Sequence, residues 1–519
     1  MKSVGTVYLV GAGPGDPQLL TLRGAELLTR AQVVVCDALV SPELLRFVPA
    51  DAEIIRRSRE HALPQEELNQ LLVKRASEGK CVVHLKGGDP YVFGRGGEEA
   101  EGLVAAGIPF EVVPGVSSVS AVPNYAGIPL THRAVSSSFT VITGHEDPAK
   151  EERNVDWAQV AKTPGTKLIL MGAERIDQLA STLQTHGMAS DTPVAMIRWG
   201  TTGQQRTVVG TLADIAVRAA EAKLTAPIVT VVGSVVALRD RLNWFEKKSL
   251  FGLRVVVTRG REQAQELAAP LLERGAEVIE VPTIRIAPPK DRQALVEAIA
   301  GLGAYDWVIF TSANGVNSFF GYFFLAFEDL RDLGGMRIAA VGPATAARLK
   351  ELHLKVELMP KEYTAKHIAK ALADYETVEN LRILLLRAEV ATPELPKLLE
   401  DLGGIVDDVA CYRTEPETED RTGAVARLKE TGADWITFTS GSTVENFHAR
   451  FDLPELGRQF PEMKFASIGP ETSKALVALG LKPTFEAQPH TLDGLVEGLE
   501  KASLGRGRGA NPKLRGKKP

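Results

Sequence analysis

The stretch Cys81–Gly97, CVVHLKGGDPYVFGRGG, decides the fold of the first half of the chain. Its apolar start, Cys81–Leu85, has the length and composition of a buried β-strand. Five glycines follow, together with the cations Lys86 and Arg95. Glycine permits backbone conformations and close approaches that other residues do not. A strand ending in so many glycines therefore predicts a loop that wraps a ligand, because an ordinary turn does not need them.

Two similar junctions flank this loop in the sequence. The strand Val7–Val10 runs into GAGPGDP at residues 11–17, and the strand ending at Val113 runs into PGVSS at residues 114–118. Parallel strands place their carboxyl ends at one edge of an α/β sheet, where ligands bind. We therefore expect one ligand site at this edge.

Asp37 follows a further expected strand, residues 32–36, and so lies at the same edge. Its position favours a functional carboxylate, although capping of the next turn is an alternative. Ser117 and Ser118 could likewise bind a ligand or cap a helix.

The composition indicates a globular protein of two to four domains. The chain has 519 residues, 44% of them hydrophobic and 24% charged, with a formal net charge of −5. These values give no bias toward nucleic acid or membranes, and no apolar run approaches about 18 residues. The start lacks the pattern of a signal peptide, so we expect a cytoplasmic protein. Cys36, Cys81 and Cys411 show no metal-ligand spacing, which predicts free thiols and no metal cofactor.

Strand-like and helix-like stretches alternate throughout, which predicts α/β domains. At RLNWFEKKSLFGLRVVVTRG, residues 241–260, a helix-like stretch ends in three charged residues and a new strand, 253–258, begins. We expect domains at 1–247 and 252–502. Residues 503–519 contain six Lys/Arg and no acid, which predicts a disordered basic tail, either a solvated extension or a contact for an anionic partner.

The second half contains an internal repeat. DWVIFTSANGV begins at Asp306 and DWITFTSGSTV at Asp434, an offset of 434 − 306 = 128. RIAAVGPATAARL begins at Arg337 and KFASIGPETSKAL at Lys464, an offset of 464 − 337 = 127. The repeat predicts two α/β lobes with a cleft between them, and helix N-termini there offer amide donors to anions. A duplicated scaffold with ordinary capping turns is the alternative.

Six ordered motifs in the first half resemble uroporphyrinogen-III C-methyltransferases of the tetrapyrrole methylase fold. They are GAGPGDPQLLTLRG, HLKGGDPYVFGRGGEE, VVPGVSS, YAGIPLTHR, VITGH and LILMG, within about residues 3–245. The resemblance implies a two-lobed α/β fold with S-adenosylmethionine between the lobes. It implies methylation of uroporphyrinogen III at C2 and C7 to give precorrin-2. The cofactor contacts that it implies are Pro14, Gly87, Gly88, Asp89, Val92, Ser117, Ser118, Met171 and Gly200.

The chemistry needs orientation and a proton acceptor more than a nucleophile, because the ring carbons of a porphyrinogen are already electron-rich. By the resemblance, Asp37 stands where the family has a proposed proton acceptor. Cations in or beside the glycine loops are expected to bind the eight substrate carboxylates: Arg23, Lys86, Arg95 and Arg133.

The chain departs from the family pattern in two places. His84 stands where the family usually has an arginine, and residues 54–69, IIRRSREHALPQEELN, lack the lysine that serves as a proposed proton donor. Arg56, Arg57 and Arg59 could bind carboxylates, but an arginine is a poor proton donor. No proton donor is therefore assigned.

The repeat and the stretch ACYRT, Ala410–Thr414, resemble uroporphyrinogen-III synthase over about residues 252–500. The resemblance implies a bilobed α/β fold that cyclises hydroxymethylbilane with inversion of ring D. Tyr412 matches a tyrosine proposed to assist loss of the hydroxyl group, with hinge packing as the alternative. The substrate contacts implied are Thr311, Ser312, Gly342, Thr439, Ser440, Gly469 and Thr472.

Together these features predict a bifunctional enzyme of tetrapyrrole biosynthesis whose second half makes the substrate of its first. The alternative is a methylase of another tetrapyrrole intermediate fused to a non-catalytic tetrapyrrole-binding module. No GxGxxG stretch supports an added dehydrogenase of the kind found in sirohaem synthases. The resemblance also implies a homodimer formed through the methyltransferase half, and it leaves sirohaem and cobalamin open as the downstream products.

Overall fold

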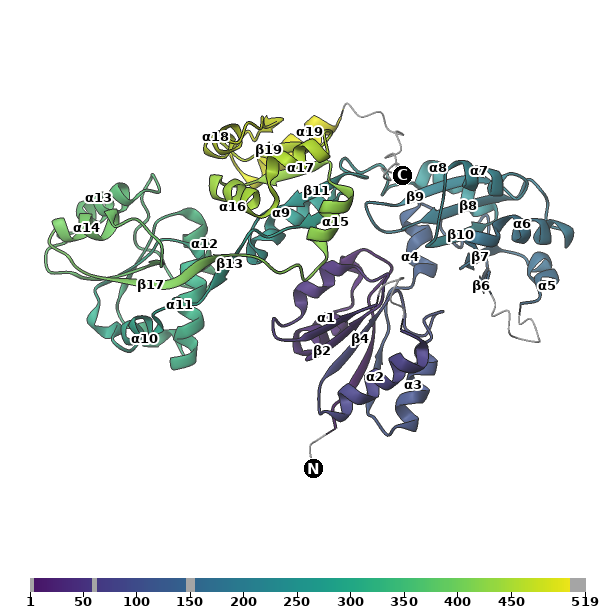
Figure 1. Ribbon diagram of the computed structural model, residues 1–519, viewed down its shortest axis with the longest axis horizontal. Coiled ribbons are helices and arrows are strands. Elements are labelled where there is room, and N and C mark those ends of the chain that lie inside the picture. Colours follow the sequence, from purple (N-terminus) through teal and green to yellow (C-terminus); the bar gives the residue numbers. More distant parts are fainter. Residues whose placement is uncertain (1–3, 58–62, 146–154, 505–519) are drawn as a thin grey trace.

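The computed structural model describes residues 4–57, 63–145 and 155–504. Over these residues the strands form four five-stranded sheets, each with helices packed on it (Figure 1). The predicted α/β class is confirmed. We call the four lobes N1, N2, C1 and C2, the first two from the N-terminal half and the last two from the C-terminal half.

Lobe N1 contains a fully parallel sheet in the order β3-β2-β4-β1-β5. Helix α1 packs on one face, and α2 and α3 on the other. Strands β1, β2 and β4 are buried along nearly their whole length, because both faces of the sheet are covered. The elements are β1 (Val7–Gly11), α1 (Leu22–Arg30), β2 (Val33–Cys36), η2 (Pro42–Phe47), β3 (Glu53–Arg56), α2 (Gln65–Ser77), β4 (Val82–Lys86), α3 (Gly96–Ala105) and β5 (Phe110–Val113).

Lobe N2 begins at α4 and contains a mixed sheet in the order β6-β7-β10-β8-β9. Only β6 and β7 pair in parallel. The elements are α4 (Ser118–Tyr125), β6 (Phe139–Thr143), α5 (Trp157–Lys162), β7 (Thr166–Leu170), α6 (Ile176–Thr185), β8 (Pro193–Arg198), β9 (Arg206–Thr211), α7 (Ile215–Glu221), β10 (Ile228–Val232) and α8 (Arg239–Leu242).

Lobe C1 contains a parallel sheet in the order β12-β11-β18-β19-β20, assembled from both ends of the C-terminal half. Its elements are β11 (Arg254–Val257), α9 (Arg261–Glu273), β12 (Glu277–Glu280), α15 (Ala424–Thr431), β18 (Trp435–Phe438), α16 (Gly441–Phe451), α17 (Leu453–Gln459), β19 (Lys464–Ser467), α18 (Pro470–Ala478), β20 (Phe485–Glu486) and α19 (Leu492–Ser503).

Lobe C2 is inserted between β12 and α15, and its sheet has the order β13-β17-β16-β14-β15. The antiparallel ladder of β13 with the long strand β17 leads toward lobe C1 (Figure 1). Its elements are β13 (Ile284–Ala287), α10 (Arg292–Ala300), β14 (Trp307–Phe310), α11 (Ala313–Ala326), β15 (Arg337–Ala340), α12 (Pro343–Glu351), α13 (Ala365–Tyr375), β16 (Arg382–Ala388), α14 (Glu394–Asp401) and β17 (Ile405–Pro416).

The sequence repeat corresponds to a structural repeat. The first pair of repeated motifs contains β14 in lobe C2 and β18 in lobe C1, and the second pair contains β15 and β19. In each lobe the two repeated strands pair side by side in parallel. The predicted bilobed arrangement is therefore confirmed.

The boundary between the halves is packed rather than open. The prediction that a helix continues to Glu246 was wrong, because α8 ends at Leu242. The next residues turn so that the rings of Trp244 and Phe245 contact Tyr125, at 5.0 and 4.8 Å between centroids. Phe245 also contacts the ring of Phe251 at 5.3 Å, which ties the segment just before the second half to the first half.

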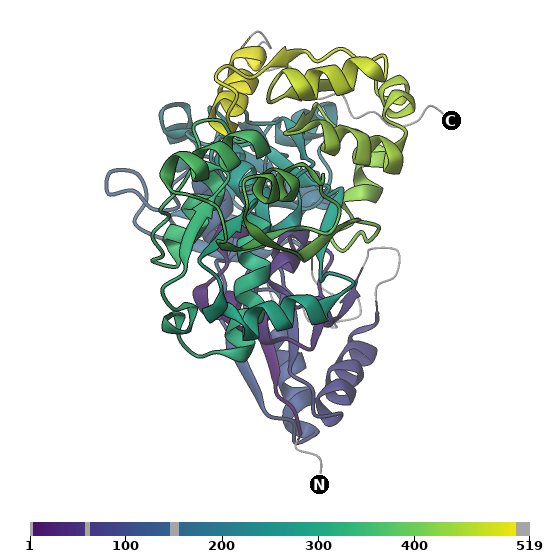
Figure 2. The same ribbon diagram turned by 90° about the vertical axis from the view of Figure 1, so that its left-hand side faces the viewer.

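Lobe C1 contacts both lobes of the N-terminal half, and in two views it lies next to N1 (Figures 1 and 2). Arg421 donates a hydrogen bond to the Pro49 carbonyl of N1 at 2.8 Å. Gln204 of N2 donates to Oε1 of Glu277 in β12 at 2.6 Å. The two halves therefore share a direct interface besides their covalent link.

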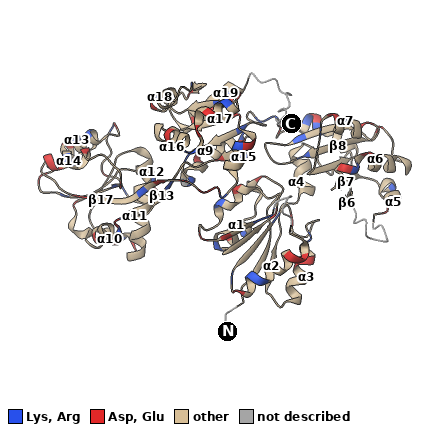
Figure 3. Ribbon diagram, viewed as in Figure 1, with Lys and Arg blue, Asp and Glu red and all other residues tan. Residues whose placement is uncertain are grey.

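The last helix of the described part of the chain is α19. Helix α19 reaches Ser503, so the first residue predicted for the basic tail is helical. The tail from residue 505 onward and Arg59 lie outside the described residues. Acidic and basic residues are interspersed along both halves (Figure 3). None of the described helices has the length and apolar character of a membrane span.

Candidate active sites

The three glycine-rich turns of lobe N1 converge at the carboxyl edge of its sheet, as expected. Gly13 and Gly88 exchange backbone hydrogen bonds of 3.3 and 2.8 Å. Both have positive φ, +76° and +69°, which glycine adopts without strain. A Cβ added to Gly11 would lie 2.5 Å from Cα of Gly115. Only glycine permits this packing, which brings the backbones of three turns together.

The carboxylate of Asp89 ties two of these turns together. Its Oδ2 accepts from the amide of Gly115 at 3.0 Å, and its Oδ1 accepts from the amide of Tyr91 at 2.8 Å. Val92 beside it is partly exposed. Ser117 is the N-cap of α4 and accepts from the amide of Val119 at 3.2 Å, so the capping alternative holds for this serine.

Lobe N2 contacts the glycine turn at residues 11–17 through hydrogen bonds to Asp16. The amide of Asp16 donates to Oγ1 of Thr201 at 3.1 Å, and the Tyr125 hydroxyl donates to Oδ2 of Asp16 at 2.8 Å. Gly200 precedes Thr201 in this loop. Met171 follows β7 with φ +55° and is half exposed.

These residues fit a ligand with polar and apolar parts. Glycine leaves backbone amides and carbonyls open to close approach, and exposed Val92 and Met171 provide apolar contacts. An adenosyl sulfonium has this character, so the residues fit S-adenosylmethionine. The contacts predicted at Pro14, Gly87 and Ser118 lie on the same turns.

Asp37 belongs to a network of charged side chains at the same edge of the sheet. His84 and Lys86, two residues apart, lie on one face of β4, and Asp37 follows the neighbouring strand β2. His84 Nε2 lies 3.4 Å from Oδ1 of Asp37, and Nδ1 lies 3.0 Å from Oε2 of Glu99 in α3. Lys86 Nζ donates to Oε1 of Glu99 at 2.6 Å and lies 4.0 Å from Oδ2 of Asp37. Arg57 donates to Oδ1 of Asp37 at 2.6 Å.

Within the network, Asp37 alone combines a cationic environment with partial exposure. Its side chain is 22% exposed, whereas those of His84 and Glu99 are fully buried. Burial raises the pKa of Asp37, but the hydrogen bond to His84 and the surrounding positive charges outweigh burial and lower it to about 2. Asp37 is therefore a carboxylate at neutral pH and can accept a proton.

The four predicted substrate cations do not form one cluster. Lys86 is buried and bonded to Glu99 inside N1. Arg23 makes hydrogen bonds of 2.8–3.0 Å to Glu111 and Glu26, and Arg95 pairs with Glu98. Arg133 is exposed. Their roles toward a substrate remain predictions.

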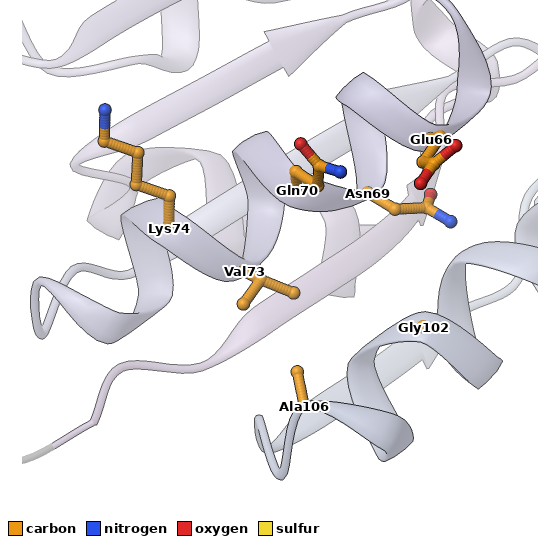
Figure 4. A pocket seen from close by; sticks show the side chains of 7 residues that line it. All are labelled: Glu66, Asn69, Gln70, Val73, Lys74, Gly102 and Ala106. Carbon is orange, nitrogen blue, oxygen red and sulfur yellow. The ribbon is translucent and has the colours of Figure 1, made fainter.

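Glu99 was not predicted from the sequence. The motif GRGGEE contained the signal, because its second glutamate lies in the first turn of α3, where it contacts His84 and Lys86. A groove between α2 and α3 lies apart from all predicted site residues (Figure 4). It is lined by Glu66, Asn69, Gln70, Val73, Lys74, Gly102 and Ala106.

In lobe C2 the predicted residues Ser312 and Tyr412 meet. Ser312 is the N-cap of α11, and its Oγ lies 3.0 Å from the Tyr412 hydroxyl. Tyr412 is buried on β17, and burial raises the pKa of its phenol. The hydroxyl therefore keeps its proton at neutral pH. Thr311 donates to the Leu386 carbonyl at 3.2 Å.

Lobe C1 repeats the serine cap of this arrangement. Ser440 caps α16 in the same position as Ser312 caps α11, and Thr439 precedes it. Gly469 caps α18, as Gly342 caps α12 in lobe C2. Thr472 is buried in the first turn of α18. Capping and ligand binding use the same atoms here, so both interpretations stay open.

The helix starts at Gly342 and Gly469 have neighbours that the motifs did not reveal. A Cβ added to Gly342 would lie 3.8 Å from the ring of Tyr363, and one added to Gly469 would lie 3.5 Å from the ring of His490. Their spacing, 490 − 363 = 127, matches the repeat. This offset in the sequence could have identified Tyr363 and His490 as an equivalent pair.

Within the described ranges, no group of three or more His, Cys, Asp or Glu side chains is arranged so that it could hold a metal ion. The cysteines Cys36, Cys81 and Cys411 are free thiols, as predicted.

Comparison with known proteins relates each half to a family. Residues 6–216 match the family of tetrapyrrole (corrin/porphyrin) methylases, and residues 265–497 match uroporphyrinogen-III synthase HemD. The porphyrin biosynthesis protein HemD of Ruminiclostridium josui is 38% identical over 501 residues, which cover 95% of this chain and 97% of that protein.

Two further relatives match the methylase half or extend beyond it. The S-adenosyl-L-methionine-dependent uroporphyrinogen III methyltransferase of Methanosarcina barkeri is 56% identical over 241 residues, 46% of this chain and 94% of that protein. The uroporphyrinogen-III C-methyltransferase of Bacillus subtilis is 39% identical over 359 residues, 69% of this chain and 74% of that protein. The chain therefore belongs to the tetrapyrrole methylases through its N-terminal half and to the uroporphyrinogen-III synthases through its C-terminal half, in one two-part protein.

Proposed function

We propose that this chain is a bifunctional enzyme of tetrapyrrole biosynthesis. The C-terminal half cyclises hydroxymethylbilane to uroporphyrinogen III with inversion of ring D. The N-terminal half methylates that product at C2 and C7 to precorrin-2. The observation that carries the proposal is that three glycine turns converge at the sheet edge where Asp37 also lies, in a chain that also holds a duplicated, bilobed second half.

S-adenosylmethionine, when bound, supplies an electrophilic methyl group. The glycine turns and the loop at Gly200 would hold it between N1 and N2, with Met171 and Val92 against its apolar parts. The turns orient the substrate ring carbon toward the methyl group, which is the main requirement of the reaction. Asp37, ionised and partly exposed, accepts the proton that the ring loses after each transfer.

In the synthase half, the lobes hold the two ends of a linear tetrapyrrole. Amides at the helix starts after β14, β15, β18 and β19 bind carboxylates. The Tyr412 hydroxyl keeps its proton because burial raises its pKa, so it can donate to the departing hydroxyl group of the substrate. Spontaneous closure without inversion competes, so control of conformation determines the product.

The organisation of the chain is part of the proposal. We assign residues 1–247 to the methyltransferase, 252–502 to the synthase and 503–519 to a basic tail. A homodimer through the methyltransferase half and a cytoplasmic location are supported by family resemblance. Light scattering of the purified chain would test the dimer, with twice the chain mass expected.

Each activity can be tested separately on the full chain. With uroporphyrinogen III and methyl-labelled S-adenosylmethionine, we expect a product carrying two labelled methyl groups. With hydroxymethylbilane alone, we expect the type III isomer. Absence of label from a folded sample that binds the cofactor would contradict the methyltransferase assignment. Formation of the type I isomer alone would indicate a binding module in place of the synthase.

A further inference from the structure

The loop between β8 and β9, which contains the predicted cofactor contact Gly200, lies between the first glycine turn and the C-terminal half. On one side, Thr201 Oγ1 accepts a hydrogen bond from the amide of Asp16 at 3.1 Å. On the other side, Gln204 donates to Oε1 of Glu277 in lobe C1 at 2.6 Å. This β8–β9 loop therefore connects the predicted cofactor site to lobe C1.

The approach of the β8–β9 loop to lobe C1 requires a glycine. A Cβ added to Gly203 would lie 2.7 Å from the backbone nitrogen of Glu277, 3.0 Å from its Cβ and 3.1 Å from the carbonyl carbon of Ala276. These three nearest atoms all belong to lobe C1, and the φ of Gly203 lies outside the left-handed region. The need for glycine here therefore comes from the contact between the halves and not from the conformation of the loop.

The carboxylate of Glu277 is buried at this contact and has partners from both halves. Its side chain is 10% exposed, and Oε1 accepts from Gln204 at 2.6 Å and from Arg427 of α15 at 3.3 Å. Burying a carboxylate is costly unless donors and positive charge surround it. Arg427 supplies the charge and Gln204 supplies a donor. Because both partners fix the direction of the Glu277 side chain, it can hold the loop in one position.

Lobe C1 also contacts lobe N1, through the segment that precedes α15. Arg421 donates to the Pro49 carbonyl at 2.8 Å, and Arg56 donates to the carbonyl of Arg421. Helix α15 packs on β12 in one hydrophobic cluster, which contains Leu428 and Ile279. One packed lobe therefore contacts both N1 and N2, the lobes between which the cofactor is proposed to bind.

We propose that Glu277 is a positioning residue of the methyltransferase site, through which lobe C1 holds the β8–β9 loop against the first glycine turn. This inference rests on the proposed methyltransferase function. Glu277 acts on the cofactor indirectly, through Gln204. The end of the loop is also held within the first half, where Gln205 donates to Glu246 at 2.9 Å. Loss of the contact with C1 should therefore weaken cofactor binding without abolishing it.

The proposal has a consequence in the C-terminal half, because coupling between two sites is reciprocal. Strand β12 is an edge strand of the C1 sheet, and the β8–β9 loop lies against it at Glu277. Amides of an edge strand exchange with solvent through local opening, which packing against the edge suppresses. Binding of S-adenosylmethionine should therefore slow amide hydrogen exchange in β12. A merely structural role of Glu277 would leave this exchange independent of the cofactor.

The test uses variants of the full chain. Gly203→Ala places a Cβ in the contact, Glu277→Ala removes the acceptor, and Glu277→Gln keeps an oxygen that can accept from Gln204. Gln204→Ala, alone and combined with Glu277→Ala, completes a double-mutant cycle. Gly335→Ala, at an exposed turn of lobe C2 with open space around its Cβ, is the matched control. Calorimetry measures the Kd of S-adenosylmethionine, and mass spectrometry measures exchange in β12 with and without it.

We expect Gly203→Ala, Glu277→Ala and Gln204→Ala each to raise this Kd about 3- to 10-fold. The double variant should raise it no further than the stronger single variant, because both residues act through one contact. Glu277→Gln and the control should stay within about twofold of wild type. In methyl transfer, KM for the cofactor should rise with Kd while kcat stays within about twofold. The cofactor should slow exchange in β12 of wild type and control, but not of Gly203→Ala.

The outcomes separate the two proposals. If the wild-type chain binds S-adenosylmethionine but does not methylate uroporphyrinogen III, the proposed function is wrong, while Kd and exchange still decide the role of Glu277. Methylation by the wild-type chain, with an unchanged Kd in Gly203→Ala and Gln204→Ala, would overturn the role of Glu277 alone. Additive effects in the double variant, or exchange in β12 that ignores the cofactor, would do the same. The wild-type exchange decides the question even if Glu277→Ala fails to fold.

Discussion

The interface between the halves contains a carboxyl group whose environment penalises its charge. Glu43 lies in η2 of lobe N1, and its Oε2 is buried without a hydrogen-bond partner among the described residues. Burial, followed by repulsion from Glu280 of lobe C1, raises its pKa from 4.5 to about 7. Glu277 adds to the repulsion, and Arg427 opposes it. We predict that Glu43→Gln stabilises the chain at pH 8.

The size and sign of the effect follow from proton linkage. The folded chain holds the Glu43 proton more tightly than the unfolded chain, so ionising Glu43 costs stability as the pH rises from about 4.5 to about 7. A pKa raised from 4.5 to about 7 corresponds to about 3 kcal/mol above that range. Below pH 4.5 the carboxyl is protonated in both states, and the cost disappears.

Thermal unfolding of the full chain at pH 5 and pH 8 measures this difference. For a domain of roughly 250 residues, a gain of about 3 kcal/mol in the free energy of unfolding raises the thermal midpoint by about 6 °C or more at pH 8. At pH 5 the midpoint should change little. Glu445→Gln, at an exposed position in the middle of α16, is the matched control and should change neither midpoint. An equal shift for Glu43→Gln at both pH values, or no shift at pH 8, would refute the reasoning.

Three further predictions concern the two sites. Asp37→Asn should lower kcat of methyl transfer about 100-fold or more with normal cofactor affinity, because the amide cannot accept the proton; unchanged kcat in a labelled-methyl assay would exclude Asp37 as the acceptor. Gly115→Ala should cost about 1–3 kcal/mol and at least about tenfold in cofactor affinity, since its Cβ would lie 2.6 Å from Cα of Gly11. Gly97→Ala, with open space around its Cβ, is the control for calorimetry. Equal cofactor affinities of the two variants would contradict the role of the packed glycine turns in holding the cofactor. Tyr412→Phe should slow formation of the type III isomer about tenfold or more and leave methyl transfer unchanged, as product analysis by chromatography can show; normal synthase activity would restrict Tyr412 to packing.

Much of the fold followed from local patterns. The glycine turns require strands before them, and the expected strands at Val7–Val10 and Cys81–Leu85 differ from β1 and β4 by one residue at their ends. The repeat predicted the paired lobes of the second half because each copy forms the same strand-turn-helix unit. The end of α8 was mispredicted, because packing of Trp244 and Phe245 on distant Tyr125 determines it.

The site was predicted less completely than the fold. The site residues at strand ends could be predicted, because sheet topology brings the ends of neighbouring strands together. The residues that contact them could not, because those contacts depend on the direction of each side chain. His84 and Lys86 share a face of β4, a consequence of the two-residue period, but their burial depends on α3 covering that face. Contacts such as Gln204 with Glu277 join residues from different halves, and no local pattern predicts them.

The central claim is that one chain makes uroporphyrinogen III and then methylates it. The most direct measurement supplies the purified full chain with hydroxymethylbilane and methyl-labelled S-adenosylmethionine together, and identifies the product by mass and isomer type. The account predicts a type III tetrapyrrole carrying two labelled methyl groups. Formation of uroporphyrinogen I alone, without label, would contradict it.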